Sequence, residues 1–426
     1  MPEQTVTLDG PEVKSFTWTG YAPPNYTDER FDWRWPDPSI NLMPPVDTVV
    51  LGGPYHSIIP GSVVVTNAVT GQVYVRGVDY QLNEEWGQIL NVKSRLGAYE
   101  SGSLSVTYRT TLQRLDLLQV LPDGTVGVKR GVSAPVVPTL PSPDAGAVAL
   151  AGVHLNTLDG AVATGFKVLD RDINMIRDVP PVAPINPGTI PKTLAKLRAG
   201  GSVNVAFFGD SITSGAEATD WLFDPSRTYT RLVADGLRSR YPTATVIETP
   251  AHQGSVSAAL AETTFQTRVL DPHNAGHKVD LLVIALGMND TGKPSTAAYK
   301  AKIRDYIARA KAVGMEVLLV PPIQSNPYFD AVHDTWVPRE QIASALREVA
   351  TQDNIAMADV FTEWMNQSAK GIAPVSQLHN WFNHPGTPGH KLYADTILRF
   401  FPNSEARNAN HPSPPPVTTN GHAITG

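Results

Sequence analysis

The chain has 426 residues, of which 42% are hydrophobic and 17% charged, so it can form more than one folded domain. A net charge of -6 argues against a nucleic-acid-binding surface as the main function, and the absence of cysteine excludes disulfides and cysteine-ligated metal sites. No apolar run approaches the roughly 20 residues that cross a bilayer. The N-terminus also lacks the basic start and apolar core of a secretory signal, so we expect a protein made in the cytoplasm, without a membrane partner.

The N-terminal part is expected to hold an extended arm and a small β module. Residues 1–48 are rich in proline and aromatic side chains, which predicts an arm that packs on a neighbouring surface or stacks on sugar rings. Residues 49–121 contain short β-like runs between turn residues, typical of an antiparallel sandwich or barrel. The predicted strands are residues 62–66, 72–75, 80–82, 88–92 and 104–108. In the last of these, apolar Leu104, Val106 and Tyr108 alternate with polar residues, as one buried face requires.

Two further segments have compositions that predict a linker with a little structure of its own and a tail without a core. Residues 122–188 contain two proline clusters and are expected to form a connector, because long unstructured loops are improbable inside a compact domain. An extended arm that meets other chains is the alternative. Residues 403–426 contain several prolines and few apolar residues, so they are predicted to be a flexible or partner-bound tail.

Residues 189–402 alternate apolar runs with helical patterns, which predicts a mostly parallel sheet covered by helices on both faces. The predicted strands are residues 203–208, 245–248, 281–285, 316–320 and 355–358. The predicted helices are residues 228–240, 295–313, 339–351 and 389–400. The third of these helices follows a proline, a reasonable helix entry.

Polar residues follow two of these strands at the point where each strand ends. Asp210 and Ser211 come directly after an apolar run that stops at Gly209, and Asn289 follows the third strand. Ligands of α/β proteins bind outside the carboxyl ends of the strands, so Ser211 is a candidate nucleophile and the Asn289 amide a candidate donor to an oxyanion. The alternatives are a common Gly-Asp-Ser turn and an asparagine that caps the next helix.

A histidine on a late loop supplies a candidate base. Pro385 restricts His384 to an extended conformation, which keeps the imidazole on a loop. A neutral imidazole there can take the proton of Ser211 and later return it to the leaving group. The chain has 11 histidines, so position has to decide between them. His379 and His390 are weaker candidates because neither precedes the proline.

Taken together, these motifs resemble the ordered blocks of the SGNH (GDSL-like) hydrolase family. The blocks are residues 209–212, Gly254, residues 287–290, and His384 with Pro385, and the resemblance covers about half of the chain. It implies a flavodoxin-like three-layer α/β domain in which Ser211 forms an acyl-enzyme and His384 is the general base. It also implies an oxyanion hole made of the N–H groups of Ser211 and Gly254 and the Asn289 amide. No metal and no organic cofactor is expected.

The sequence departs from the family at one position. The family usually has an aspartate three residues before the histidine, but Trp381 stands there, preceded by Asn380. The Asn380 amide or a backbone carbonyl could fix the imidazole tautomer, although neither stabilises an imidazolium as well as a carboxylate. The enzyme would then work as a Ser-His dyad, or a carboxylate would come from elsewhere, with Asp359 and Asp395 as candidates.

The N-terminal half bears on the substrate. Residues 59–63, 77–80, 87–89 and 102–106 loosely resemble a β module of phage structural and tail proteins. We therefore expect removal of acetyl (acyl) esters from carbohydrate, with host surface polysaccharide as substrate and with other virion proteins or like chains, in a trimer for example, as partners. One alternative is a virion structural or receptor-binding protein with an inactive hydrolase-like module. Another is a general short-chain carboxylesterase.

Overall fold

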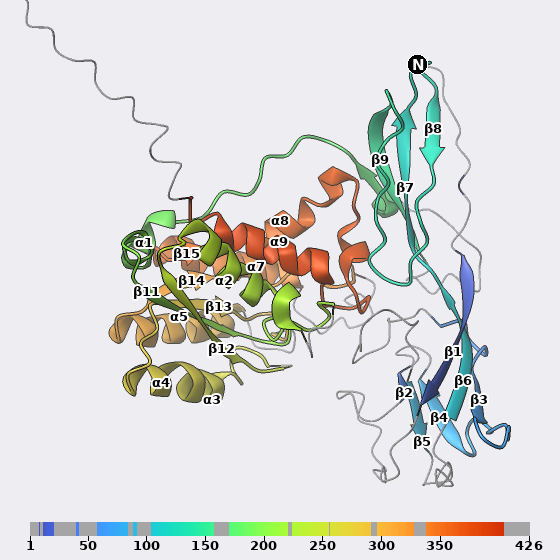
Figure 1. Cartoon of the computed structure of the whole chain (residues 1–426), viewed down its shortest axis with the longest axis horizontal. Coiled ribbons are helices and arrows are strands. Elements are labelled where there is room, and N and C mark those ends of the chain that lie inside the picture. Colours follow the sequence, from blue (N-terminus) through green and yellow to red (C-terminus); the bar gives the residue numbers. More distant parts are fainter. Residues whose placement is uncertain are drawn as a thin grey trace, which may run out of the picture.

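The computed structural model describes residue 8 and residues 12–20, 40–41, 58–83, 88–91, 104–156, 170–219, 224–254, 256–290, 296–327 and 338–403. An α/β domain is joined to antiparallel sheets that lie beside it (Figure 1). Most of the aromatic arm predicted in residues 1–48, and the tail beyond residue 403, lie outside these ranges. Within them, no helix is both long and apolar enough to span a bilayer.

The α/β domain is built on a five-stranded sheet with order β12-β11-β13-β14-β15. Every pair of neighbouring strands is parallel, as the alternating pattern predicted. The strands are β11 (Ser202–Gly209), β12 (Thr245–His252), β13 (Leu281–Ala285), β14 (Glu316–Leu319) and β15 (Ala356–Met357). Because β11 lies between β12 and β13, the segments that follow these three strands emerge next to one another.

Helices cover both faces of this sheet. They are α1 (Pro191–Arg198), α2 (Tyr229–Arg240), α3 (Glu262–Phe265), α4 (Asp271–Asn274), α5 (Thr296–Ala312), α7 (Arg339–Gln352), α8 (Val360–Met365) and α9 (Thr387–Leu398). Short helical turns are η3 (Asp170–Asp172), η4 (Pro187–Thr189), η5 (Pro225–Arg227), η6 (Gln266–Leu270), η7 (Ser368–Lys370) and η8 (Pro374–Gln377). The four predicted helices correspond to α2, α5, α7 and α9. The last begins at Thr387, two residues earlier than expected, because Pro388 fits its first turn.

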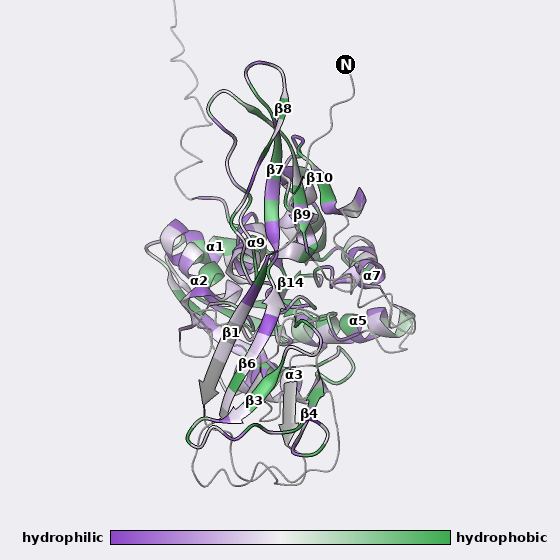
Figure 2. Cartoon of the chain, turned by 90° about the vertical axis from the view of Figure 1, so that its right-hand side faces the viewer, coloured by the Kyte–Doolittle hydropathy of each residue, from purple (hydrophilic) through white to green (hydrophobic). Residues whose placement is uncertain are grey.

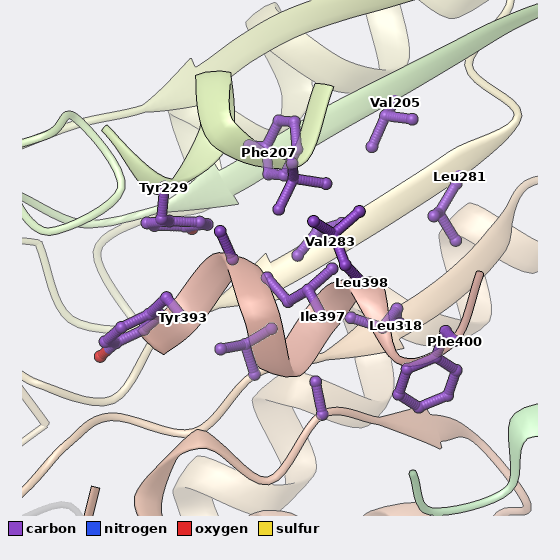
Figure 3. Packing of buried hydrophobic residues seen from close by; sticks show 14 of the residues in the cluster. Val205, Phe207, Tyr229, Leu281, Val283, Leu318, Tyr393, Ile397, Leu398 and Phe400 are labelled. Atoms are coloured by element: carbon purple, nitrogen blue, oxygen red, sulfur yellow. The ribbon is translucent and has the colours of Figure 1, made fainter. Parts of the chain in front are cut away.

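The core has one hydrophobic cluster on each face of the sheet. Successive residues of β11 point to opposite faces, so Phe207 joins the cluster beneath α2 and α9, while Phe208 joins the cluster beneath α5 and α7. Figure 3 shows α9 placing Ile397 and Leu398 against Val283 and its neighbours on the sheet. This double coverage explains why the inner strands β11, β13 and β14 are largely apolar, whereas the edge strand β12 is partly exposed and contains polar residues.

The N-terminal module forms two small antiparallel sheets. Their orders are β1-β6-β3 and β2-β5-β4. The strands are β1 (Val13–Gly20), β2 (Ile40–Asn41), β3 (Val64–Asn67), β4 (Tyr80–Asn83), β5 (Gln88–Asn91) and β6 (Leu104–Thr111). In β6, Val106 and Tyr108 are buried and Thr107 is exposed, which confirms the predicted alternation. The predicted strand at residues 72–75 is wrong: only an isolated bridge between Val73 and Thr66 forms there.

The segment expected to be a connector with a little structure of its own contributes three strands to a four-stranded sheet. Strand β7 (Arg114–Val120) pairs with β8 (Val126–Lys129) and β9 (Val148–Leu155), and β9 pairs with β10 (Ile173–Met175). The first proline cluster lies in the loop between β8 and β9, and the second follows β10, so neither removes a ladder hydrogen bond. Figure 2 shows this sheet above the β1-β6-β3 sheet. The domain boundaries themselves remain a prediction.

The four-stranded sheet is attached to the α/β domain by backbone contacts. The N–H of Arg177 donates to the carbonyl of Ala369 at 2.9 Å, just before the turn at Gly371. A Cβ at Gly152 in β9 would lie 1.8 Å from the carbonyl oxygen of Gly371, so only glycine permits this approach. The antiparallel and parallel parts therefore share a close-packed contact.

Candidate active site

The strand order brings the sequence motifs to one edge of the parallel sheet. Gly209 at the end of β11 is opposite His252 of β12 and Ala285 of β13. Asp210 and Ser211 follow β11, Gly254 follows β12 and Asn289 follows β13. These residues therefore belong to three adjacent segments at the carboxyl ends of the strands.

The turn that carries Ser211 depends on its neighbours. A Cβ at Gly209 would lie 2.0 Å from Oγ1 of Thr213, so no other residue fits there. The next residue, Asp210, is buried, and its Oδ1 accepts a hydrogen bond from the N–H of Ile212 at 3.1 Å. Burial raises the pKa of Asp210 to about 7. Ser211 itself is 9% exposed, so its hydroxyl is held at the margin of the fold.

His384 lies on a loop that closes on itself before α9. The carbonyl of His384 accepts the N–H of His379 at 2.8 Å, and the N–H of Gly386 donates to Gln377 at 3.0 Å. This closure brings Nε2 of His384 to 2.8 Å from Oγ of Ser211. The hydroxyl donates to Nε2, so the neutral imidazole carries its hydrogen on Nδ1. A serine paired in this way with a histidine is the arrangement that activates a hydroxyl for nucleophilic attack.

Asn380 organises this loop instead of orienting the imidazole. Its Oδ1 accepts three backbone N–H groups, those of Phe382 at 3.0 Å, Asn383 at 2.9 Å and His384 at 3.0 Å. Its Nδ2 donates to Oδ1 of Asn383 at 3.1 Å. The structure therefore differs from the expectation that the Asn380 amide receives the imidazole N–H, because the side chain is taken up by the turn.

Trp381, at the position of the family aspartate, anchors the loop. Its side chain is fully buried and its backbone has φ 58°, a left-handed conformation that is unusual for a large residue. The carbonyl of Trp381 accepts Nδ2 of Asn326 at 2.8 Å, and that of Phe382 accepts the N–H of Asn326 at 2.7 Å. The backbone hydrogen bonds fix the loop and the buried indole provides packing. No carboxylate reaches His384 from this position.

The carboxylate beside His384 belongs to Glu217, which the sequence analysis did not single out. Its side chain is 4% exposed, with Oε2 3.0 Å from Nδ1 of His379 and Oε1 3.7 Å from Nδ1 of His384. Burial would raise the pKa of Glu217, but the two imidazoles outweigh it and hold the pKa below its usual value. The available signal was an acidic residue among small residues, Gly215, Ala216 and Ala218, shortly after the nucleophile turn.

The carboxylates and the histidine considered as alternatives have other partners. Asp359 caps α8 by accepting the N–H of Thr362 and pairs with Arg347 at 2.7 Å. Asp395 pairs with Lys391 at the surface. His390 is fully buried, with Nε2 3.1 Å from the carbonyl of Ala216, and burial lowers its pKa to about 4. These three residues serve the fold.

The remaining predicted site residues border the same edge. Nδ2 of Asn289 donates to the carbonyl of Val256 at 3.2 Å, which uses one of its two N–H bonds and fixes the amide. Gly254 is exposed, and a Cβ there would meet no atom within 4 Å. Over the ranges that the structure describes, no group of three or more His, Asp or Glu side chains is arranged to hold a metal ion.

Comparison with known proteins agrees with this geometry. Residues 207–392 match the model of the GDSL-like Lipase/Acylhydrolase family, a segment that includes Ser211, Gly254, Asn289 and His384. The chain contains a GDSL-like acylhydrolase domain. This SGNH domain is the parallel α/β part of the fold, whereas the antiparallel sheets precede the match. No curated protein matches the sequence significantly.

Several solved structures are similar to part of this chain at low identity. A two-domain esterase active on acetylated mannans, co-crystallised with mannopentaose, is 17% identical with TM-score 0.40, and the match covers 55% of this chain and 58% of that chain. An acetylxylan esterase from Geobacillus stearothermophilus is 20% identical with TM-score 0.39, covering 47% of this chain and 94% of that chain. A lipase/acylhydrolase from Enterococcus faecalis is 18% identical with TM-score 0.38, covering 46% of this chain and 94% of that chain.

Proposed function

We propose that the protein is a serine esterase in which Ser211 is the nucleophile and His384 the general base. The observation that carries this proposal is the 2.8 Å distance between Oγ of Ser211 and Nε2 of His384. An inactive hydrolase-like module would be favoured by a separation too great for a hydrogen bond, and this distance argues against it. The acylhydrolase family of the domain supports the same chemistry.

In the proposed reaction, Oγ of Ser211 attacks the carbonyl carbon of the ester while Nε2 of His384 accepts the hydroxyl proton. The imidazolium then donates this proton to the leaving alcohol, and the acyl group remains on Ser211. A water molecule that gives its proton to His384 attacks the acyl-enzyme and releases the carboxylic acid. The proton then returns to Ser211, so the enzyme is regenerated without a cofactor.

The developing oxyanion needs donors at the edge where the strands end. The N–H groups of Ser211 and Gly254 and the second N–H of the Asn289 amide are the proposed donors. Each such donor is worth about 3 kcal/mol of transition-state stabilisation in serine hydrolases. The contact between Asn289 and Val256 supports this role because it fixes the amide before substrate arrives.

We propose acetylated carbohydrate as the substrate class. The support is the antiparallel half of the chain, part of which lies beside the segment that carries His384 and could contact a polymer bound there. A Cβ at Gly386 would lie 2.8 Å from Cγ2 of Val137, so a loop of that half borders the segment that carries His384. Action on host surface polysaccharide from a virion rests on the loose resemblance of the N-terminal module to phage proteins, and it stays part of the proposal.

A panel of polymeric and small ester substrates tests this function. We expect acetate release from O-acetylated xylan or mannan, and from p-nitrophenyl acetate, with turnover falling as the acyl chain lengthens. Turnover of soluble short-chain esters alone would contradict the carbohydrate substrate and favour a general carboxylesterase. No hydrolysis of any ester in the panel would contradict the enzyme and favour a structural or receptor-binding protein.

A further inference from the structure

We propose that Glu217 is the acidic member of the catalytic site and orients His384 through Nδ1. It does so from the turn that follows Ser211, not from the loop before His384 where the family has its aspartate. The inference rests on the proposed function, because it assigns the partner of the same general base. His379 is assigned as a positioning residue that holds the other oxygen of this carboxylate.

Hydrogen bonds of the turn after Ser211 place Glu217 next to the loop that carries His379 and His384. The turn after the nucleophile is closed by the N–H of Ala216, which donates to the carbonyl of Ser211 at 3.0 Å. Glu217 follows with φ 71°, a left-handed conformation that this turn imposes. The N–H of Thr219 then donates to Oγ1 of Thr387 at 2.9 Å, which ties the turn to the start of α9. The carboxylate is therefore held by the segment that also holds Ser211.

The imidazole of His384 needs an acceptor for the hydrogen on its Nδ1. Its Nε2 receives the Ser211 hydroxyl, so Nδ1 carries a hydrogen, yet Nδ1 is buried and makes no hydrogen bond with the described residues. Oε1 of Glu217 lies 3.7 Å away, too long for a hydrogen bond and within the range of an ion pair. Catalytic hydrogen bonds are often long in unliganded sites and shorten when substrate binds.

The charge of Glu217 suits this role. The side chain is nearly fully buried and remains ionised at neutral pH, since the neighbouring imidazoles lower its pKa. When His384 takes the proton of Ser211, the resulting imidazolium faces a carboxylate in a region with little solvent. An opposite charge at this distance stabilises the protonated imidazole, which an asparagine or a backbone carbonyl does less well.

His379 keeps the carboxylate in place. Nδ1–H of His379 donates to Oε2 of Glu217 at 3.0 Å, which leaves Oε1 directed to His384. The backbone N–H of His379 donates to the carbonyl of His384, so the two histidines come from one closed loop. A carboxylate bridging two imidazoles thus takes the place of the aspartate that Trp381 displaces.

The test compares Glu217→Gln, Glu217→Asp and His379→Asn with the wild type, using full-length protein. A matched control is Glu363→Gln. Glu363 is another buried glutamate, it lies outside the site, and its Oε2 is 2.7 Å from Nη1 of Arg399. We expect Glu217→Gln to lower kcat about 10²- to 10⁴-fold with little change in KM. Glu217→Asp should recover part of the loss, His379→Asn should lose less than tenfold, and Glu363→Gln should keep the wild-type kcat.

The pH profile separates a catalytic contact from a structural one. Asp210, His379, His390 and Glu217 are the titratable groups close to His384, and only the last loses its charge in Glu217→Gln. Because the carboxylate favours the imidazolium, its loss should move the acid limb of the kcat/KM profile to lower pH. An unchanged limb together with a kcat within threefold of wild type would overturn the assignment.

A readout that needs no substrate distinguishes this inference from the proposed function. A proton NMR signal that disappears in His384→Gln identifies Nδ1–H of His384, and we expect Glu217→Gln to shift it, because the carboxylate lies 3.7 Å from Nδ1. A signal that Glu217→Gln leaves unchanged would overturn the contact, whether or not the protein hydrolyses esters. Absence of ester hydrolysis by the wild type would instead contradict the proposed function.

Discussion

Strand β11 of the parallel sheet and strand β7 of the antiparallel sheet are both largely buried, but they place their polar residues differently. In β11 the buried residues are apolar apart from Asn204, and the charged groups follow the strand at its carboxyl end. In β7, Arg114, Asp116 and Gln119 lie within the strand at 1%, 1% and 2% exposure. Figure 2 shows hydrophilic and hydrophobic residues alternating along β7. Burial of charge therefore serves two purposes in this chain.

The hydrogen-bond partners tell the two purposes apart. Within β7, Arg114 donates twice to Asp116, at 2.7 and 2.9 Å, and Oδ1 of Asp116 also accepts the N–H of Gly131 at 2.8 Å. Beyond the end of β11, by contrast, the imidazole of His384 reaches Ser211 and is partly exposed, while its buried Nδ1 makes no hydrogen bond with the described residues. Arg114 is thus paired with a carboxylate of its own strand, whereas the carboxylate that faces His384 is that of Glu217, from a different segment and 3.7 Å away.

The largest effect should come from the parallel half. Changing His384→Ala removes the base that accepts the Ser211 proton, so kcat should fall by about 10⁴-fold or more while the free energy of unfolding changes by about 1 kcal/mol or less. Ester hydrolysis measures the change in kcat, and thermal unfolding of the same preparation measures the change in stability. A large loss of stability with the activity per folded molecule preserved would break the comparison.

The next effect should come from the antiparallel half, where the substitution should lower stability much more than activity. Changing Asp116→Ala leaves the Arg114 guanidinium buried without its carboxylate, which should destabilise the four-stranded sheet by about 3–5 kcal/mol. The chain has several parts and need not unfold in one step, so amide hydrogen exchange of β7 and β9 is the appropriate measurement. Activity should fall much less than exchange protection. The matched control is the exposed Asp178→Ala, which should change neither quantity.

A smaller effect follows from a buried histidine of the same sheet. His154 in β9 contacts Oε1 of Gln113 at 2.8 Å, and burial lowers its pKa to about 3. The unfolded chain binds this proton at higher pH, so stability is full above about pH 6.5 and declines as pH falls toward 3. The loss at pH 5 should be about 2 kcal/mol relative to pH 7. Exchange protection of β9 in wild type and His154→Gln checks this, and equal pH dependence in both would contradict it.

The smallest effect should come from the loop of the catalytic histidine. Changing Asn380→Ala removes the acceptor of three backbone N–H groups but no group that contacts the imidazole. We expect about a tenfold loss in kcat and about 1 kcal/mol of stability, both far below the cost of losing His384. A loss in kcat equal to that of His384→Ala would show that Asn380 orients the imidazole after all.

The sequence predicted the parallel half well because that half has a strong local signal. Residues buried on both faces form continuous apolar runs, and glycine and polar residues mark each strand end, so β11, β13 and the position of Ser211 could be predicted. In the antiparallel half, proline-rich loops hid β8, β9 and β10. Strands β8 and β10 are short, and β9 pairs with β7 across the proline-rich stretch between them, which no local pattern reveals.

Glu217 could not be predicted for a related reason. Ser211 and His384 stand in motifs with fixed neighbours, whereas Glu217 reaches His384 across 167 residues through a turn with a left-handed backbone. Asn380 was the nearer candidate in sequence, but its amide is used by the loop. Side-chain partners of this kind depend on the direction of each residue within the fold, which spacing alone does not give.

The measurement that tests the account most directly is acetate release by the wild type and by Ser211→Ala, from O-acetylated polysaccharide and from p-nitrophenyl acetate. The account predicts release by the wild type from both substrates. It predicts release at the uncatalysed rate by Ser211→Ala, with both proteins equally folded. Equal release by the two proteins would contradict the assignment of Ser211 as the nucleophile.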